Sequence, residues 1–101
     1  MVLTERIQSE KLRSAINMLK VIAHPVRLAI VDLLTEKNRM TILEIQDALN
    51  LEQAIASQQI TLMEDKGVLK SEKIGRSKYV SLRFPKMQTI VDCLEDCCNE
   101  H

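Results

Sequence analysis

The apolar positions in the first third of the chain recur at helical spacing. They predict an amphipathic helix over about residues 4–21 and a second helix that begins at Pro25, since proline is favoured at the first helical position. Residues 36–39 are polar and are expected to form an exit loop. The apolar positions of the two helices are Leu3, Ile7, Ala15, Ile16, Leu19, Ile22, Val26, Ala29, Ile30, Leu33 and Leu34.

Thr41 and Glu44 mark the start of a short third helix. Their spacing is that of a capping box, in which each side chain accepts a hydrogen bond from the backbone N–H of the other residue. The predicted helix covers about residues 41–49. The connection at 50–52 has the length that separates the two helices of a helix-turn-helix.

The fourth helix, over about residues 52–66, has two different faces. Gly67 is placed to end it in the left-handed conformation. One face is apolar, with Ala56, Ile60 and Met63. The opposite face carries neutral hydrogen-bonding side chains, which are Gln53, Ser57, Gln58 and Thr61. Residues 41–66 therefore predict a helix-turn-helix.

From residue 68 to residue 83 the period changes from helical to alternating. Val80 and Leu82 fall on one side of a predicted strand, and Gly75 lies at a hairpin tip, where a positive φ is needed. A last helix, over about 86–98, follows Pro85. The element order is α-α-α-α-β-β-α, a mainly α fold with a small β-hairpin. It predicts a single winged helix-turn-helix domain over 1–101, with the hairpin as the wing.

Charge is distributed unevenly along a chain whose formal net charge is zero. Residues 41–65 hold five acidic and no Lys or Arg side chains, whereas residues 66–86 hold seven basic side chains and one acid. Because phosphate neutralisation supplies much of the affinity for nucleic acid, the basic hairpin is the expected phosphate-facing part. Its candidate contacts are Lys73, Arg76 and Lys78.

The neutral face of the fourth helix is suited to reading bases. Glutamine bonds adenine through its N6 and N7 edge, and Ser and Thr are permissive readers or phosphate donors. The candidate readers are Gln53, Ser57, Gln58 and Thr61. The competing interpretations are a solvated helix face and a winged-helix protein-interaction module without DNA readout, which the neutral net charge and the acidic residues 41–65 favour.

Three segments resemble the ArsR-type (arsenic-repressor-like) winged-helix regulators. VIAHPVRLAIVDLL at 21–34 resembles the second helix of that family, and LEQAIASQQITLMEDKGVL at 51–69 is similar to its recognition helix and the run into the wing. GRSKYVSL at 75–82 looks like its wing turn and second strand. The resemblance implies a homodimeric repressor that binds operator DNA and is released by an inducer, often a metal ion. It also implies a dimer formed by the first and last helices.

The apolar stripes at the two ends of the chain agree with that dimer. A chain of 101 residues buries a limited share of its surface, so an isologous partner would cover apolar faces that the monomer leaves open. The expected interface residues are Leu3, Ile7, Ile16, Met87, Ile90, Val91 and Leu94. Such a dimer would place two recognition helices about 34 Å apart on palindromic double-stranded DNA.

The known metal patterns of that family are missing here. Residues 41–49, TILEIQDAL, hold no cysteine, and the start of the last helix lacks the expected Asp and His. No metal site is therefore assigned and no cofactor is expected, although Cys93, Cys97 and His101 are spaced to share one flank of a helix. The three cysteines, Cys93, Cys97 and Cys98, have three open interpretations: structural packing, thiol chemistry or metal sensing.

Several function classes find no support in the sequence. There is no nucleophile–His–acid set and no glycine-rich phosphate loop, so an enzyme is not expected. No apolar run approaches the length of a membrane span, and the charged first residues do not match a signal peptide. The expectation is a cytoplasmic protein without a membrane partner. The inducer, the operator and the regulated genes are not specified by the residues.

Overall fold

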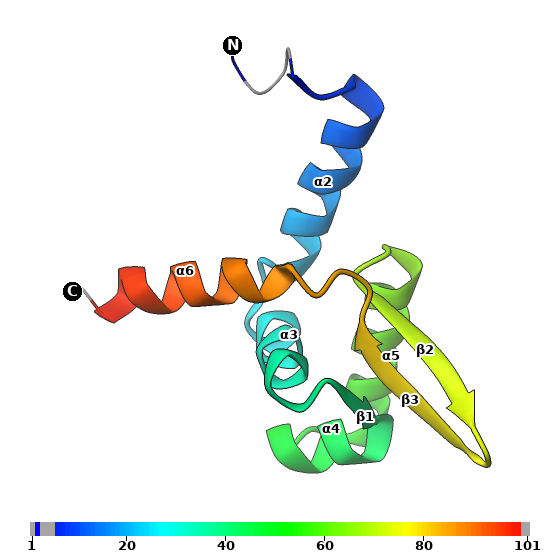
Figure 1. The fold of residues 1–101 in the computed structure, drawn as a ribbon. Coiled ribbons are helices and arrows are strands. Elements are labelled where there is room, and N and C mark those ends of the chain that lie inside the picture. The colour runs from blue at the N-terminus through cyan, green and yellow to red at the C-terminus, as the bar shows by residue number, and fades with distance from the viewer. Residues whose placement is uncertain (1, 3–5, 100–101) are drawn as a thin grey trace.

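The computed structural model describes residues 2 and 6–99 of the chain. Five helices and three strands follow one another within that part (Figure 1). Their bounds are α2 Ser9–Ile22, α3 Pro25–Lys37, β1 Arg39–Thr41, α4 Ile42–Leu49, α5 Gln53–Asp65, β2 Leu69–Ile74, β3 Ser77–Leu82 and α6 Met87–Asn99. The winged helix-turn-helix order is confirmed, with one added strand.

The added strand is β1, which lies where the sequence predicted the end of a polar loop. It pairs antiparallel with β3, placing Met40 opposite Val80, and the sheet order is β1-β3-β2. Met40 is buried, whereas Arg39 is exposed. A strand of three residues is too short to show alternation in the sequence, and its partner lies far along the chain. The expected order without this strand was therefore wrong at this point.

The hydrophobic core lies between α3, α4, α5 and the sheet. The side chains that are almost fully buried there are Ile30, Val31, Leu34, Ile45, Ile60, Met63, Val68, Leu69 and Val80. The buried alternation of β3 is the predicted one, with Val80 and Leu82 inward. The core thus joins the helix-turn-helix to the base of the wing.

Local backbone signals behave as the sequence indicates. The capping box at α4 is present, with Glu44 N donating to Thr41 Oγ1 at 3.1 Å and Thr41 N donating to Glu44 Oε1 at 3.0 Å. This pair lowers the pKa of Glu44, chiefly because the backbone N–H of Thr41 bonds its carboxylate. Gly67, after α5, has φ +80°. His24 caps α3, since its Nδ1 accepts from Val26 N at 3.3 Å.

Two helices extend beyond this core. In Figure 1, α2 and α6 extend away from α4 and α5 in different directions, and the β2–β3 hairpin projects on another side. α2 buries Val21 and Ile22 in its last turn, and α6 buries Met87 in its first. The outer turns of both helices lie off the core.

Candidate nucleic-acid interface

The turn between α4 and α5 sets the direction of the second helix. Asn50 adopts the left-handed conformation with φ 52°, which Asn tolerates better than most residues. The backbone N–H of Leu51 donates to Gln46 O at 2.9 Å, which closes the end of α4. The chain then turns within residues 50–52 and enters α5 at Gln53.

The two faces of α5 separate as predicted. Ala56, Ile60 and Met63 are fully buried against the core. On the other side Gln53, Gln58 and Thr61 are exposed and Ser57 is half-buried. No charged side chain lies between Gln53 and Met63. The helix therefore presents a neutral, hydrogen-bonding surface over its first three turns.

One glutamine of α5 is engaged inside the protein instead. Arg27 of α3 donates from Nε to Gln59 Oε1 at 2.7 Å and from a terminal guanidinium nitrogen to Val21 O at 3.2 Å. A single guanidinium thus links the end of α2, α3 and α5. Sequence reasoning missed this pair, because residues 32 positions apart carry no spacing signal.

The β2–β3 hairpin carries exposed cations. Its register places Lys73 opposite Lys78 and Ile74 opposite Ser77, so Gly75 and Arg76 form the turn. Gly75, the first turn residue, has φ +62°, whereas Arg76, the second, has a negative φ. This combination is the pattern of a type II′ turn. Lys73, Arg76 and Lys78 are all exposed, which agrees with the predicted wing.

Lys78 differs from the other two cations in having an ion-pair partner within the described part of the chain. Its Nζ lies 3.6 Å from Glu64 Oε1, near the end of α5. Glu64 was not a candidate in the sequence analysis, because an acid among polar residues at a helix end gives no distinctive pattern.

Those predicted dimer residues that the structure describes fall into three groups. Ile16 and Leu94 are exposed, while Ile7, Ile90 and Val91 are half-buried. Met87 is only 7% exposed and belongs to the monomer core, because it lies where α6 meets the other elements. It therefore offers little surface to a partner. Leu3 lies outside the described residues.

Further apolar surface accompanies these residues. A groove of about 290 Å³ runs between α2 and α6, with exposed Leu19 and Phe84 among its lining residues. Phe84 follows β3 and was not a sequence candidate. Apart from Lys86, the lining is apolar: Ala15, Met18, Leu19, Ile22, Phe84, Met87 and Ile90.

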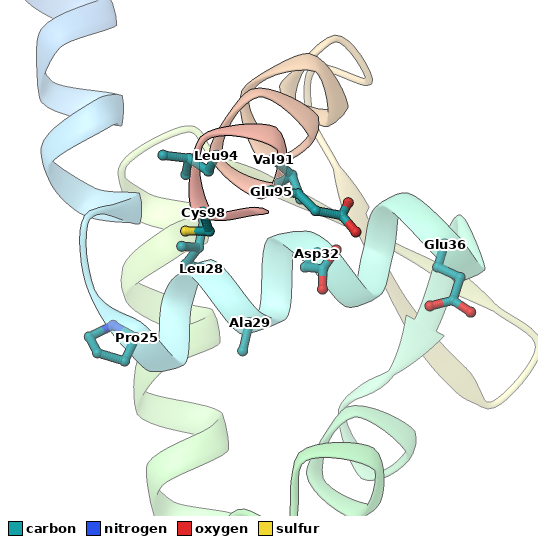
Figure 2. A pocket seen from close by; sticks show the side chains of 9 residues that line it. All are labelled: Pro25, Leu28, Ala29, Asp32, Glu36, Val91, Leu94, Glu95 and Cys98. Carbon is teal, nitrogen blue, oxygen red and sulfur yellow. The ribbon is translucent and has the colours of Figure 1, made fainter. Parts of the chain in front are cut away.

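A second, larger groove of about 700 Å³ lies between α3 and α6 (Figure 2). Leu28 and Val91 are among its apolar residues, and Glu95 and Asp32 contribute carboxylates from the two helices. Cys98 of α6 and Leu28 of α3 both line the groove. The groove combines apolar and acidic lining and includes one of the three cysteines.

The three cysteines on α6 are free and exposed. The pKa of Cys97 is raised, chiefly by the neighbouring Cys93 thiol. Within residues 2 and 6–99, no three His, Cys, Asp or Glu side chains are grouped to hold a metal ion. His101, the fourth member of the cluster in the sequence, lies outside the described residues. None of the described helices is long and apolar enough to cross a membrane.

The sequence was compared with family models and with known proteins. A family model described as a helix-turn-helix domain matches residues 22–72. The transcriptional repressor PagR of Bacillus anthracis is 34% identical over 89 residues, which cover 88% of this chain and 89% of PagR. The chain belongs to the helix-turn-helix family that this model describes, and its relative PagR is a transcriptional repressor.

Solved structures agree with this family. The crystal structure of PagR has a TM-score of 0.80 at 33% identity and covers 86% of this chain and 99% of its own. The repressor BigR of Xylella fastidiosa has a TM-score of 0.78 at 23% identity, with 94% and 96% covered. The homodimeric winged helix-turn-helix domain Mb0332 of Mycobacterium bovis, a possible ArsR-family regulator, has a TM-score of 0.77 at 19% identity, with 94% and 90% covered. At these low identities, the similarity to BigR and Mb0332 shows the fold alone.

Proposed function

We propose that this protein is a homodimeric repressor that binds operator DNA with α5 in the major groove and the wing along the phosphate backbone. The observation that carries the proposal is the division of chemistry between two adjacent surfaces. α5 is neutral and hydrogen-bonding, and the hairpin beside it is cationic. Repression is supported by the similarity to the repressor PagR.

Base reading is assigned to the exposed face of α5. Gln53 and Gln58 can each bond an adenine through two atoms, and Ser57 and Thr61 donate to bases or phosphates. Gln59 is left out, because its amide oxygen is held by Arg27 at 2.7 Å. A face without Lys or Arg adds little general affinity, so its contribution is to sequence preference.

Phosphate binding is assigned to the wing. Arg76 stands at the tip of the hairpin, and Lys73 lies three residues before it on β2. Both side chains are exposed, and a cation on a projecting hairpin reaches phosphates without disturbing the core. This local positive charge supplies affinity that the zero net charge of the chain does not.

The homodimer is supported by the apolar surface that α2 and α6 leave open. Leu94 is 43% exposed and Ile16 41%, and the 290 Å³ groove between the two helices is almost wholly apolar. An isologous partner would cover these faces on both protomers. Mb0332, which shares the fold, is homodimeric.

Release by an inducer is the last part of the proposal. The candidate sensing groups are the exposed thiols of Cys93, Cys97 and Cys98, carried by the helix that forms the proposed interface. A change at these thiols would act on the dimer and so on the spacing of the two α5 helices. Oxidation and metal binding are the two chemistries to distinguish.

The test is binding of the purified, reduced protein to the DNA upstream of its own gene at two salt concentrations, with and without zinc or an oxidant. The expected complex is specific, weakens steeply with salt, and contains a dimer of twice the 11.6 kDa chain mass. Release by one treatment would identify the class of inducer. Binding that ignores both treatments would contradict the sensing role of the cysteines, and no specific binding would favour a protein-interaction module.

A further inference from the structure

The carboxylate of Glu64 joins the recognition helix to both strands of the wing. Its Oε2 accepts from Ser71 Oγ of β2 at 3.4 Å, and its Oε1 lies 3.6 Å from Lys78 Nζ of β3. The Glu64 side chain is 23% exposed and that of Lys78 51%. Oε1 itself is inaccessible to solvent and accepts no hydrogen bond from the described residues. The Lys78 ammonium is therefore the group that offsets the negative charge of this buried oxygen.

The sheet register explains why Lys78 takes this position. Lys73 and Lys78 are direct cross-strand partners, so both side chains project from the same face of the hairpin. Like charges directly opposite each other are unfavourable. A carboxylate beneath one of them relieves that repulsion. Glu64 fulfils this role from α5, while Lys73 and Arg76 have no ion-pair partner among residues 2 and 6–99.

We propose that Glu64 is a positioning residue of the interface: it holds Lys78 in an ion pair against α5, so that Lys73 and Arg76, but not Lys78, neutralise phosphates. The inference rests on the proposed DNA-binding function and revises the expected role of Lys78. It also attaches the wing to the end of α5 through two strands at once. In this proposal, these two contacts of Glu64 fix the distance between α5, which reads bases, and the hairpin tip, which binds phosphates.

This arrangement favours specific over general binding. General affinity depends on the number of cations that neutralise phosphates, whatever the sequence. A free lysine at position 78 would reach phosphates in any register through its flexible stem. When Glu64 holds Lys78, this lysine does not raise the affinity for random DNA, to which α5 makes no base contacts. The expected consequence is a lower affinity for random DNA and a higher specificity ratio.

The experiment measures binding to a random-sequence DNA duplex over a range of salt concentrations. Glu64→Gln keeps an oxygen that accepts from Ser71 but removes the charge. We expect it to steepen the salt slope by about one unit. We also expect the preference for operator over random DNA to fall about twofold to fivefold, the range of a surface ion pair. Lys78→Met alone should leave the slope unchanged.

Two further variants complete the cycle. The double variant Glu64→Gln with Lys78→Met should return to the wild-type slope, because the cation released by the first change is absent. Arg76→Ala, the matched control, should flatten the slope by about one unit. Misfolding cannot imitate the expected gain in binding for Glu64→Gln, and unfolding midpoints of all variants check the others.

Other results would overturn the assignment. An unchanged slope in Glu64→Gln would show that the charge of Glu64 does not control phosphate contact by Lys78. A loss in Lys78→Met equal to that in Arg76→Ala would show that Lys78 contacts phosphates while paired. If the wild-type protein shows no salt-dependent binding, every slope is near zero and the proposed function itself fails. The two failures are therefore distinguishable.

Discussion

Helices α5 and α6 have the same length, 13 residues, but bury their apolar faces in different ways. α5 buries Ala56, Ile60 and Met63 within its own protomer. α6 buries only Met87 fully, keeps Ile90 and Val91 half-buried, and exposes Leu94. The apolar side of α5 is complete in the monomer, and that of α6 is not.

The difference shows how one small domain separates folding from assembly. The inner face of α5 stabilises the monomer, which leaves its outer face free to carry the neutral polar side chains of the proposed DNA contact. α6 extends beyond the core (Figure 1), so part of the apolar surface of its outer turns, such as Leu94, stays open in the monomer. Substitutions on the two helices should therefore change different measurements.

The largest expected effect comes from Leu94→Asp. A carboxylate on the open face of α6 would prevent the proposed partner from covering it, because an unpaired charge is costly to bury. The variant should sediment as a folded monomer. Its operator affinity should fall by about 100-fold or more, since a monomer loses the bivalent contact.

The control for this substitution is Thr89→Asp, which adds the same charge to an exposed position of α6 away from the apolar stripe. It should leave mass and affinity unchanged. A Leu94→Asp variant that remains dimeric would show that Leu94 does not lie in the dimer interface. The proposed difference between α5 and α6 would then be wrong.

The next effect concerns the inner face of α5. Ile60→Ala removes a side chain that is 1% exposed and should lower the free energy of unfolding by about 2–5 kcal/mol. Ile55→Ala makes the same chemical change on the same helix at a side chain that is 38% exposed, and should cost much less. Urea unfolding of both variants gives the comparison. Equal losses would mean that burial does not distinguish the two faces.

A smaller effect is expected on the outer face of α5. Gln58→Ala should lower discrimination between operator and mismatched DNA by about 1–3 kcal/mol, because a base contact is lost. Its stability should not change, since Gln58 is exposed. Gln88→Ala on the exposed side of α6 is the matched control. A parallel fall in specific and random binding would instead make Gln58 a backbone contact.

The smallest effect concerns the capping box that starts α4, the helix that supports α5. Thr41→Ala should lower stability by about 1 kcal/mol, while Thr41→Ser should retain most of it. Because the pKa of Glu44 is lowered in the folded state, its contribution is present at neutral pH and is lost as the pH falls through that lowered value. Glu44→Gln should therefore flatten the acid limb of the stability profile. An acid limb identical to wild type would contradict this.

Much of this protein was predictable from local patterns. The capping box at Thr41, the left-handed glycines 67 and 75, and the buried face of α5 each depend on residues close together in the sequence. Helical and alternating periods therefore located the helix-turn-helix and the wing. The resemblance in residues 21–34 and 51–69 added a relationship to helix-turn-helix repressors, and the comparisons confirm a helix-turn-helix family and the repressor PagR as a relative.

Tertiary structure decided what depends on residues far apart in the sequence. The strand β1 exists because β3 lies beside it, and Met87 is buried because α6 starts against the core. Glu64 becomes significant only when Ser71 and Lys78 fold back over α5. Arg27 meets Gln59 only in the folded chain. Spacing along the sequence reports which side of an element a residue occupies, whereas its partner across the core or the sheet is set by how the elements pack.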